Sequence, residues 1–150
     1  MPQDRYLEDI VPGETSTGAP IAITREAVVA FATEFDPQPM HIDNAAASEG
    51  RFGGLIASGW HVASLVMRDF VLSAPFGGTP LLGIRMDNLC WLLPVRPGDI
   101  LIATREVLEV VRSSKNPAYG RIRMSTTVVN QTGAVAMTME TLIQIPVRGD

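Results

Sequence analysis

The chain has a single cysteine, Cys90, among its 150 residues. One thiol excludes an intramolecular disulfide and any metal site built from several cysteines. Because Cys90 lies in the apolar run NLCWLL, we expect a buried, unreactive thiol.

Positive charge is scarce as well. The formal net charge is −4, the isoelectric point is about 5.1, and the arginines are scattered, so the chain lacks the basic stripe that binds nucleic-acid phosphates. No run approaches the roughly 18 apolar residues of a membrane span. The opening MPQDRYLEDIVPGE has no apolar core of a signal peptide. These absences predict a soluble, cytoplasmic protein that binds neither nucleic acid nor membrane.

What the chain does contain predicts one domain over residues 1–150, since this length suits a single core. A helix is predicted over 25–35, with Thr24 as its N-cap. Pro37 ends it, because the residue before a proline is disfavoured in the α region. Asp43 can cap a second short helix over 44–49.

The segment 58–72 predicts a longer helix with apolar residues around most of its circumference. Only His61, Ser64 and Arg68 form a polar stripe. A helix of this kind is buried on most sides.

Four strands are predicted after that helix, over 82–92, 99–112, 120–130 and 135–146. The links between them are of hairpin length, and NQTG places Gly133 at a turn. One buried helix followed by antiparallel strands implies the α+β arrangement called the hotdog fold, in which a curved sheet wraps around a long helix. Such a sheet leaves an edge strand open, and a homodimer would cover it.

The chemistry of the chain is predicted to lie at DPQPMHID, residues 36–43. Asp36 and His41, one of only two histidines, stand five residues apart with Pro37 and Pro39 between them. A carboxylate and an imidazole on a stiff segment can converge on one reacting atom.

Four segments together resemble the MaoC-like acyl dehydratases, a family that contains the (R)-specific enoyl-CoA hydratases. They are DPQPMH, FGGLIASGWHVASL, LLPVRPGDIL and NQTGAVAM, and the resemblance runs over about residues 24–145. It implies an acyl-CoA hydratase or dehydratase with the hotdog fold, an acyl-CoA thioester as substrate, and a homodimer or a dimer of dimers.

The resemblance also implies roles. Asp36 would be the principal base, and His41 would orient the water and shuttle its proton. Burial is expected to raise the pKa of Asp36, and the neighbouring His41 is expected to oppose this rise. The N–H of Gly59, at the start of the long helix, would hold the negative charge on the thioester oxygen.

Substrate-binding roles are expected for Gly59, Ser58, Gln38 and Trp60. Gln38 and Ser58 depart from the family, which often has Asn and His at these two positions. No metal or redox cofactor is expected, because the thioester itself accepts the electrons.

Other interpretations remain open. Asp36 could be a turn residue, and Gly59 could serve only close helix packing. His61 is expected to be structural and Asp43 to be a helix cap. Two other functions fit the fold, namely a hotdog thioesterase and a non-catalytic acyl-binding module, although a pure binder gains nothing from a charged pair in an apolar tunnel.

Overall fold

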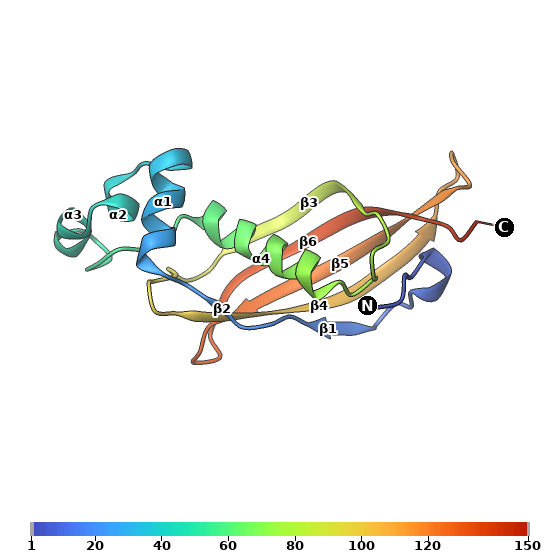
Figure 1. The fold of residues 1–150 in the computed structure, drawn as a ribbon, viewed down its shortest axis with the longest axis horizontal. Coiled ribbons are helices and arrows are strands. Elements are labelled where there is room, and N and C mark those ends of the chain that lie inside the picture. Colours follow the sequence, from blue (N-terminus) through green and yellow to red (C-terminus); the bar gives the residue numbers. More distant parts are fainter. Residues whose placement is uncertain (1, 150) are drawn as a thin grey trace.

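The computed structural model describes residues 2–149, and one antiparallel sheet dominates it (Figure 1). Its strands run in the order β1-β4-β5-β6-β3, and β2 pairs separately with β4. The strands are β1 (Thr15–Thr17), β2 (Ile21–Ala22), β3 (Leu82–Trp91), β4 (Ile100–Arg112), β5 (Tyr119–Val129) and β6 (Val135–Pro146).

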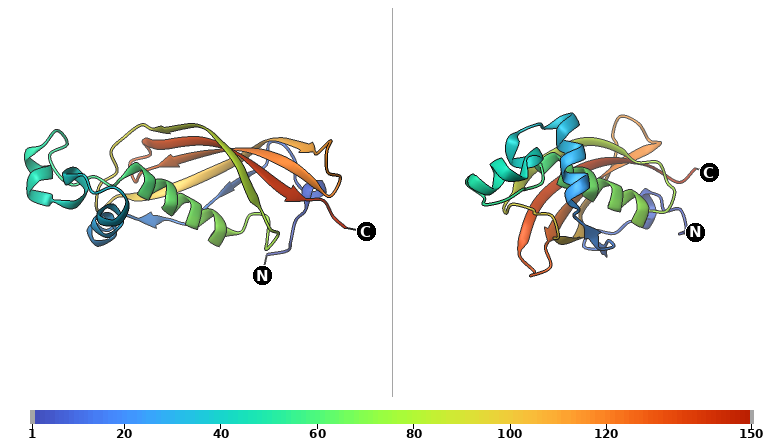
Figure 2. Two further views of the ribbon diagram at one scale, coloured as in Figure 1. Left: turned by 90° about the horizontal axis from the view of Figure 1, so that it is seen from above. Right: turned by 60° about the vertical axis from the view of Figure 1, so that its left-hand side comes forward.

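One helix lies along the sheet, three gather beyond one end of it, and a short 3-10 helix lies near the opposite end (Figures 1 and 2). They are η1 (Leu7–Asp9), α1 (Arg25–Phe35), α2 (Pro39–Ile42), α3 (Asn44–Glu49) and α4 (Gly59–Ser73). The long helix α4 crosses one face of the curved sheet, which confirms the predicted hotdog arrangement.

The core lies between α4 and the sheet. Val62 and Val66 of α4 are almost fully buried among side chains of β4, β5 and β6, including Leu101, Val128 and Met137. Alternation of buried and exposed residues along β5 turns one face of that strand toward this core. A second cluster surrounds Phe70 near the end of α4.

The local signals at the helix starts are confirmed. The Thr24 hydroxyl accepts a hydrogen bond from the Ala27 N–H, and the Asp43 carboxylate accepts from Ala45 and Ala46. The short helix α2 was not predicted; it begins with Pro39, whose fixed φ suits a first helical residue.

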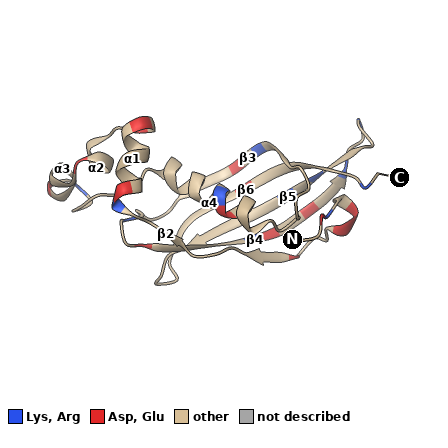
Figure 3. Ribbon diagram, viewed as in Figure 1, with Lys and Arg blue, Asp and Glu red and all other residues tan. Residues whose placement is uncertain are grey.

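Two burial predictions are wrong. Trp60, Met67, Val71 and Leu72 leave one side of α4 exposed, so the helix is not buried on most sides. Cys90 is exposed too, because β3 is the edge strand and most of its residues are in contact with solvent. Both α4 and β3 carry basic and acidic residues (Figure 3), and large apolar side chains are exposed on both elements.

No helix within residues 2–149 is long and apolar enough to cross a bilayer.

Candidate active site

Asp36 lies where α1 ends, and the chain turns sharply after it. Its N–H donates to Ala32 O as the C-cap of α1, while its own C=O accepts from the Gln38 N–H. Pro37 prevents α1 from continuing and Pro39 starts α2. The turn brings His41, on α2, back toward the Asp36 carboxylate.

Three side chains contact that carboxylate. Gln38 Nε2 donates to Oδ1 at 2.8 Å, Ser58 Oγ donates to Oδ2 at 2.8 Å, and His41 Nε2 lies 3.3 Å from Oδ2. The Asp36 side chain is 22% exposed and that of His41 only 4%. The carboxylate is therefore held by the protein on one side and reaches solvent on the other.

The partners of His41 define where its protons lie. Nδ1 is 2.7 Å from Ile56 O, and a carbonyl can only accept, so Nδ1 carries a proton. Nε2 faces Asp36 Oδ2, so a proton can pass between the two side chains at this contact.

The pKa of Asp36 is lowered from its ordinary value of 3.8. The hydrogen bond from Gln38 is the largest cause; partial burial opposes it, and Ser58 and His41 lower the pKa further. Burial raises this pKa and His41 lowers it, as expected, but the hydrogen bonds from Gln38 and Ser58 to the charged form were not predicted, and with them the net shift is downward. Asp36 is ionised at neutral pH and available as a base.

Ser58 precedes α4 as its N-cap residue but does not cap it. A serine in this position usually accepts a hydrogen bond from an amide of the first turn. Here its hydroxyl donates to Asp36 instead, and no side chain within residues 2–149 caps α4. Among residues 2–149, none accepts a hydrogen bond from the Gly59 N–H. The positive end of α4 therefore has a free amide.

A cavity of about 350 Å³ adjoins this helix start. Asp36, Gly59 and Trp60 line it, together with Trp91, Leu92 and Leu93. His41, Ser58 and Gln38 are not among its walls; all three contact Asp36 instead. The structure thus brings all six predicted site residues together, with Asp36 between the cavity and the side chains that hold it.

Comparison with known proteins identifies the family of this chain. The profile of the family described as "MaoC like domain" matches residues 9–130. The chain belongs to the MaoC-like family. The YdeM protein of Bacillus subtilis, which is uncharacterised, is 30% identical over 83% of this chain and 87% of its own.

Two solved structures are similar to this MaoC-like chain. The MaoC-like dehydratase from Rhodospirillum rubrum is 34% identical, with a TM-score of 0.87 over 97% of this chain and 99% of that one. The (R)-hydratase PhaJ1 from Pseudomonas aeruginosa is 27% identical, with a TM-score of 0.79 over 97% and 88%.

The second histidine of this MaoC-like protein lies away from Asp36. His61 is buried on α4, stacked on Phe31 with ring centroids 4.9 Å apart, and its Nδ1 has no partner within residues 2–149. Burial, with a smaller effect from Arg68, lowers the pKa of His61. No group of three His, Cys, Asp or Glu side chains suited to a metal ion occurs in the same residues.

Sequence reasoning missed Trp91 as a wall of the cavity. It lies at the end of β3, and its indole Nε1–H donates to Gly59 O at 3.0 Å. The only available signal was the rarity of tryptophan, with two in the chain, and nothing in their spacing shows that they meet.

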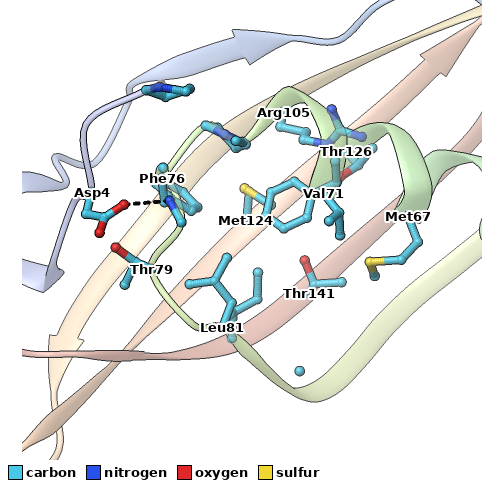
Figure 4. Close-up of a pocket in the computed structure, with 18 of the residues that line it drawn as sticks. Asp4, Met67, Val71, Phe76, Thr79, Leu81, Arg105, Met124, Thr126 and Thr141 are labelled. Carbon is cyan, nitrogen blue, oxygen red and sulfur yellow. Dashed lines mark hydrogen bonds between the residues drawn. The ribbon is translucent and has the colours of Figure 1, made fainter.

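A larger cavity, of about 1260 Å³, lies farther along α4 and shares no wall residue with the first. Met67 and Val71 of α4 face Leu81, Met124 and Thr141 across it (Figure 4). None of its wall residues is among the six predicted site residues, and we assign this larger cavity no chemistry of its own.

Proposed function

We propose that this protein adds water reversibly to a trans-2-enoyl thioester, giving a 3-hydroxyacyl thioester, with Asp36 and His41 as the acid–base pair. The observation that carries the proposal is the 3.3 Å contact between His41 Nε2 and Asp36 Oδ2 beside a cavity that Asp36 lines. Membership of the MaoC-like family and the similarity to an (R)-hydratase support hydratase or dehydratase chemistry.

In this reaction, Asp36 removes a proton from a water molecule, and the resulting hydroxide bonds to C3. The electrons of the double bond move toward the thioester oxygen, and C2 receives a proton from the pair. The pair thus takes up one proton and returns one. His41 lies behind Asp36 and is suited to relay that proton, because its Nδ1–H is held by Ile56 O.

The thioester oxygen becomes negatively charged in the transition state. The free N–H of Gly59, at the N-terminus of the 15-residue helix α4, is suited to receive it, since the helix dipole favours negative charge there. Loss of one such donor typically costs on the order of 3 kcal/mol of transition-state stabilisation.

The substrate in this proposal is an acyl-CoA, and the protein works as a homodimer. Exposed apolar residues of α4 and of the edge strand β3 line the larger cavity together, and they form one face that includes Met67, Val71, Ile84 and Met86. Such a face and an open strand edge are usually covered by a partner.

Sedimentation is expected to give twice the chain mass, and Ile84→Glu is expected to shift the measured mass toward that of the monomer. A monomeric wild type at micromolar concentration would contradict this.

The proposed function is tested by following the loss of enoyl-thioester absorbance with crotonyl-CoA, alongside an assay for released thiol. Asp36→Asn and His41→Ala are expected to lower kcat/KM about a hundredfold or more, with circular dichroism unchanged. Asp43→Asn is the matched control, because asparagine caps a helix as well as aspartate does and Asp43 caps α3.

Loss of the double bond without thiol release supports the hydratase. Release of thiol would instead show a thioesterase. Absence of both reactions over a range of acyl groups would leave a binding module and remove the catalytic roles of Asp36 and His41.

A further inference from the structure

Both tryptophans of the chain lie at the cavity beside Asp36. Trp60 is the second residue of α4 and Trp91 the last of β3, and their rings meet edge to face with centroids 5.2 Å apart. Both line the cavity and both are partly exposed, at 58% and 44%. A ligand that reaches Asp36 and Gly59 through this cavity therefore contacts indole.

Trp91 also holds the peptide that follows Gly59. Its Nε1–H donates to Gly59 O at 3.0 Å. The ring lies against the Gly59 Cα so closely that a Cβ at this position would be 2.5 Å from Trp91 Cε2. Close helix packing therefore does require glycine here, and the residue that packs on it is Trp91.

The contact matters because the start of α4 has few other restraints. Glycine has the greatest backbone freedom of all residues, and the Ser58 hydroxyl bonds to Asp36 rather than to α4. An N–H that stabilises a developing charge has to be held in place before the reaction. Among the described side chains, only that of Trp91 bonds to the backbone of Gly59.

We propose that Trp91 is a positioning and specificity-determining residue: its indole N–H fixes Gly59, and its ring limits the length of the acyl group that the cavity accepts. This inference rests on the proposed function. The length limit is argued from the position of the Trp91 ring, which is a wall of the cavity of about 350 Å³, so that a smaller side chain there would enlarge the cavity.

Two substitutions separate the two roles. Trp91→Phe keeps an aromatic wall but removes the N–H, so kcat for crotonyl-CoA is expected to fall about tenfold with KM changed less than about twofold. Trp91→Leu also removes most of the wall, so the ratio of kcat/KM for octenoyl-CoA to that for crotonyl-CoA is expected to rise about tenfold or more.

Tyr119→Phe and Tyr119→Leu are matched controls, because Tyr119 is partly exposed and lines neither cavity. Sedimentation of each variant shows whether its subunit assembly is unchanged.

Intrinsic fluorescence tests the site without any turnover. In Trp60→Phe the only tryptophan left is Trp91, and its emission is expected to change when saturated butyryl-CoA binds but much less with decanoyl-CoA at the same concentration. Equal responses to the two ligands, or no response to either, would overturn the length limit, even if Trp91→Leu does not fold.

The outcomes also separate this inference from the proposed function. If wild type hydrates crotonyl-CoA but Trp91→Phe keeps its kcat, the positioning role is wrong and the hydratase stands. If wild type hydrates no enoyl-CoA, the proposed function fails and the positioning role fails with it, while a selective fluorescence response to butyryl-CoA would still establish Trp91 as the wall of a short-acyl site.

Discussion

The Ser58 hydroxyl donates a hydrogen bond to Asp36 Oδ2 at 2.8 Å instead of capping the helix that Ser58 precedes. One side chain therefore has two effects on the candidate site. It holds the carboxylate in place, and it leaves the first amides of α4 free of a side-chain cap. Ser58 is fully buried, so water does not compete for this bond.

Ser58→Ala is expected to lower kcat/KM by about tenfold, since a hydrogen bond to a charged group contributes about 1.5–3 kcal/mol and part of this loss is recovered by rearrangement around Asp36. Steady-state kinetics with crotonyl-CoA measures the change. Ser48→Ala is the control, because the Ser48 hydroxyl bonds only to Asn44 O on exposed α3. Equal activity of Ser58→Ala and Ser48→Ala would mean that Ser58 does not position Asp36.

Gln38→Ala is expected to move the acid limb of the pH profile of kcat/KM to higher pH. The Gln38 hydrogen bond is the largest cause of the lowered pKa of Asp36, so its loss raises that pKa, and the base is then protonated at a higher pH. The shift should exceed that of Ser58→Ala, whose hydrogen bond is a smaller cause.

Gln131→Ala provides the comparison for Gln38→Ala. Gln131 Nε2 makes a similar bond to Asp99 at 2.9 Å, and Asp99 lines neither cavity. If Gln38→Ala leaves the acid limb at the same pH, or moves it to lower pH, Asp36 is not the group whose ionisation limits activity.

Helix caps could be predicted from local sequence, whereas individual side-chain hydrogen bonds between distant residues could not. Thr24 and Asp43 cap their helices as expected, because a cap involves only the next three residues. The bond between Ser58 and Asp36 joins residues 22 apart, and that between Trp91 and Gly59 residues 32 apart. No periodicity in the sequence connects such pairs. The Ser58 hydrogen bond to Asp36 and the place of Trp91 in the cavity wall are therefore evident only from the folded structure.

The burial of α4 shows a related limit. Its apolar circumference predicts burial on most sides, but an apolar side chain carries no information on whether its own chain or another copy covers it. Met67 and Val71 are apolar and yet exposed in the single chain.

His61 is expected to make the protein less stable in mild acid. Its pKa in the folded state is lowered from the ordinary value of 6.5, so below that pH the unfolded chain binds a proton that the folded one does not. Stability therefore falls as the pH drops below 6.5, toward the lower folded-state pKa.

Substitution of His61 removes this dependence. His61→Phe is expected to lose less stability than wild type between pH 7.5 and 5.5, as measured by urea denaturation. Arg68→Gln is expected to lie between the two, because Arg68 is the smaller cause of the shift. Parallel curves for wild type and His61→Phe would assign the acid sensitivity to other groups.

The buried ion pair of Asp69 and Arg105 is expected to make a large contribution to stability only while both partners are present. Arg105 Nη1 donates to Asp69 Oδ2 at 2.9 Å, and the side chains are 2% and 6% exposed, Arg105 being the less exposed. The pair joins α4 to β4 across the core, and Asp69 also accepts from the Ala19 N–H.

Asp69→Asn leaves the Arg105 charge buried without its partner, so we expect a loss of about 3–5 kcal/mol in the free energy of unfolding. Arg105→Met leaves the Asp69 carboxylate buried without its partner and should lower the free energy of unfolding by a similar amount. The double substitution Asp69→Asn with Arg105→Met removes both charges and is expected to be more stable than either single variant, because no uncompensated charge remains. Chemical denaturation of the four proteins measures the coupling.

Additive losses in the double variant would mean that the ion pair itself contributes little. The two side chains would then stabilise the fold independently, the carboxylate through Ala19 and the guanidinium through the Val66 carbonyl.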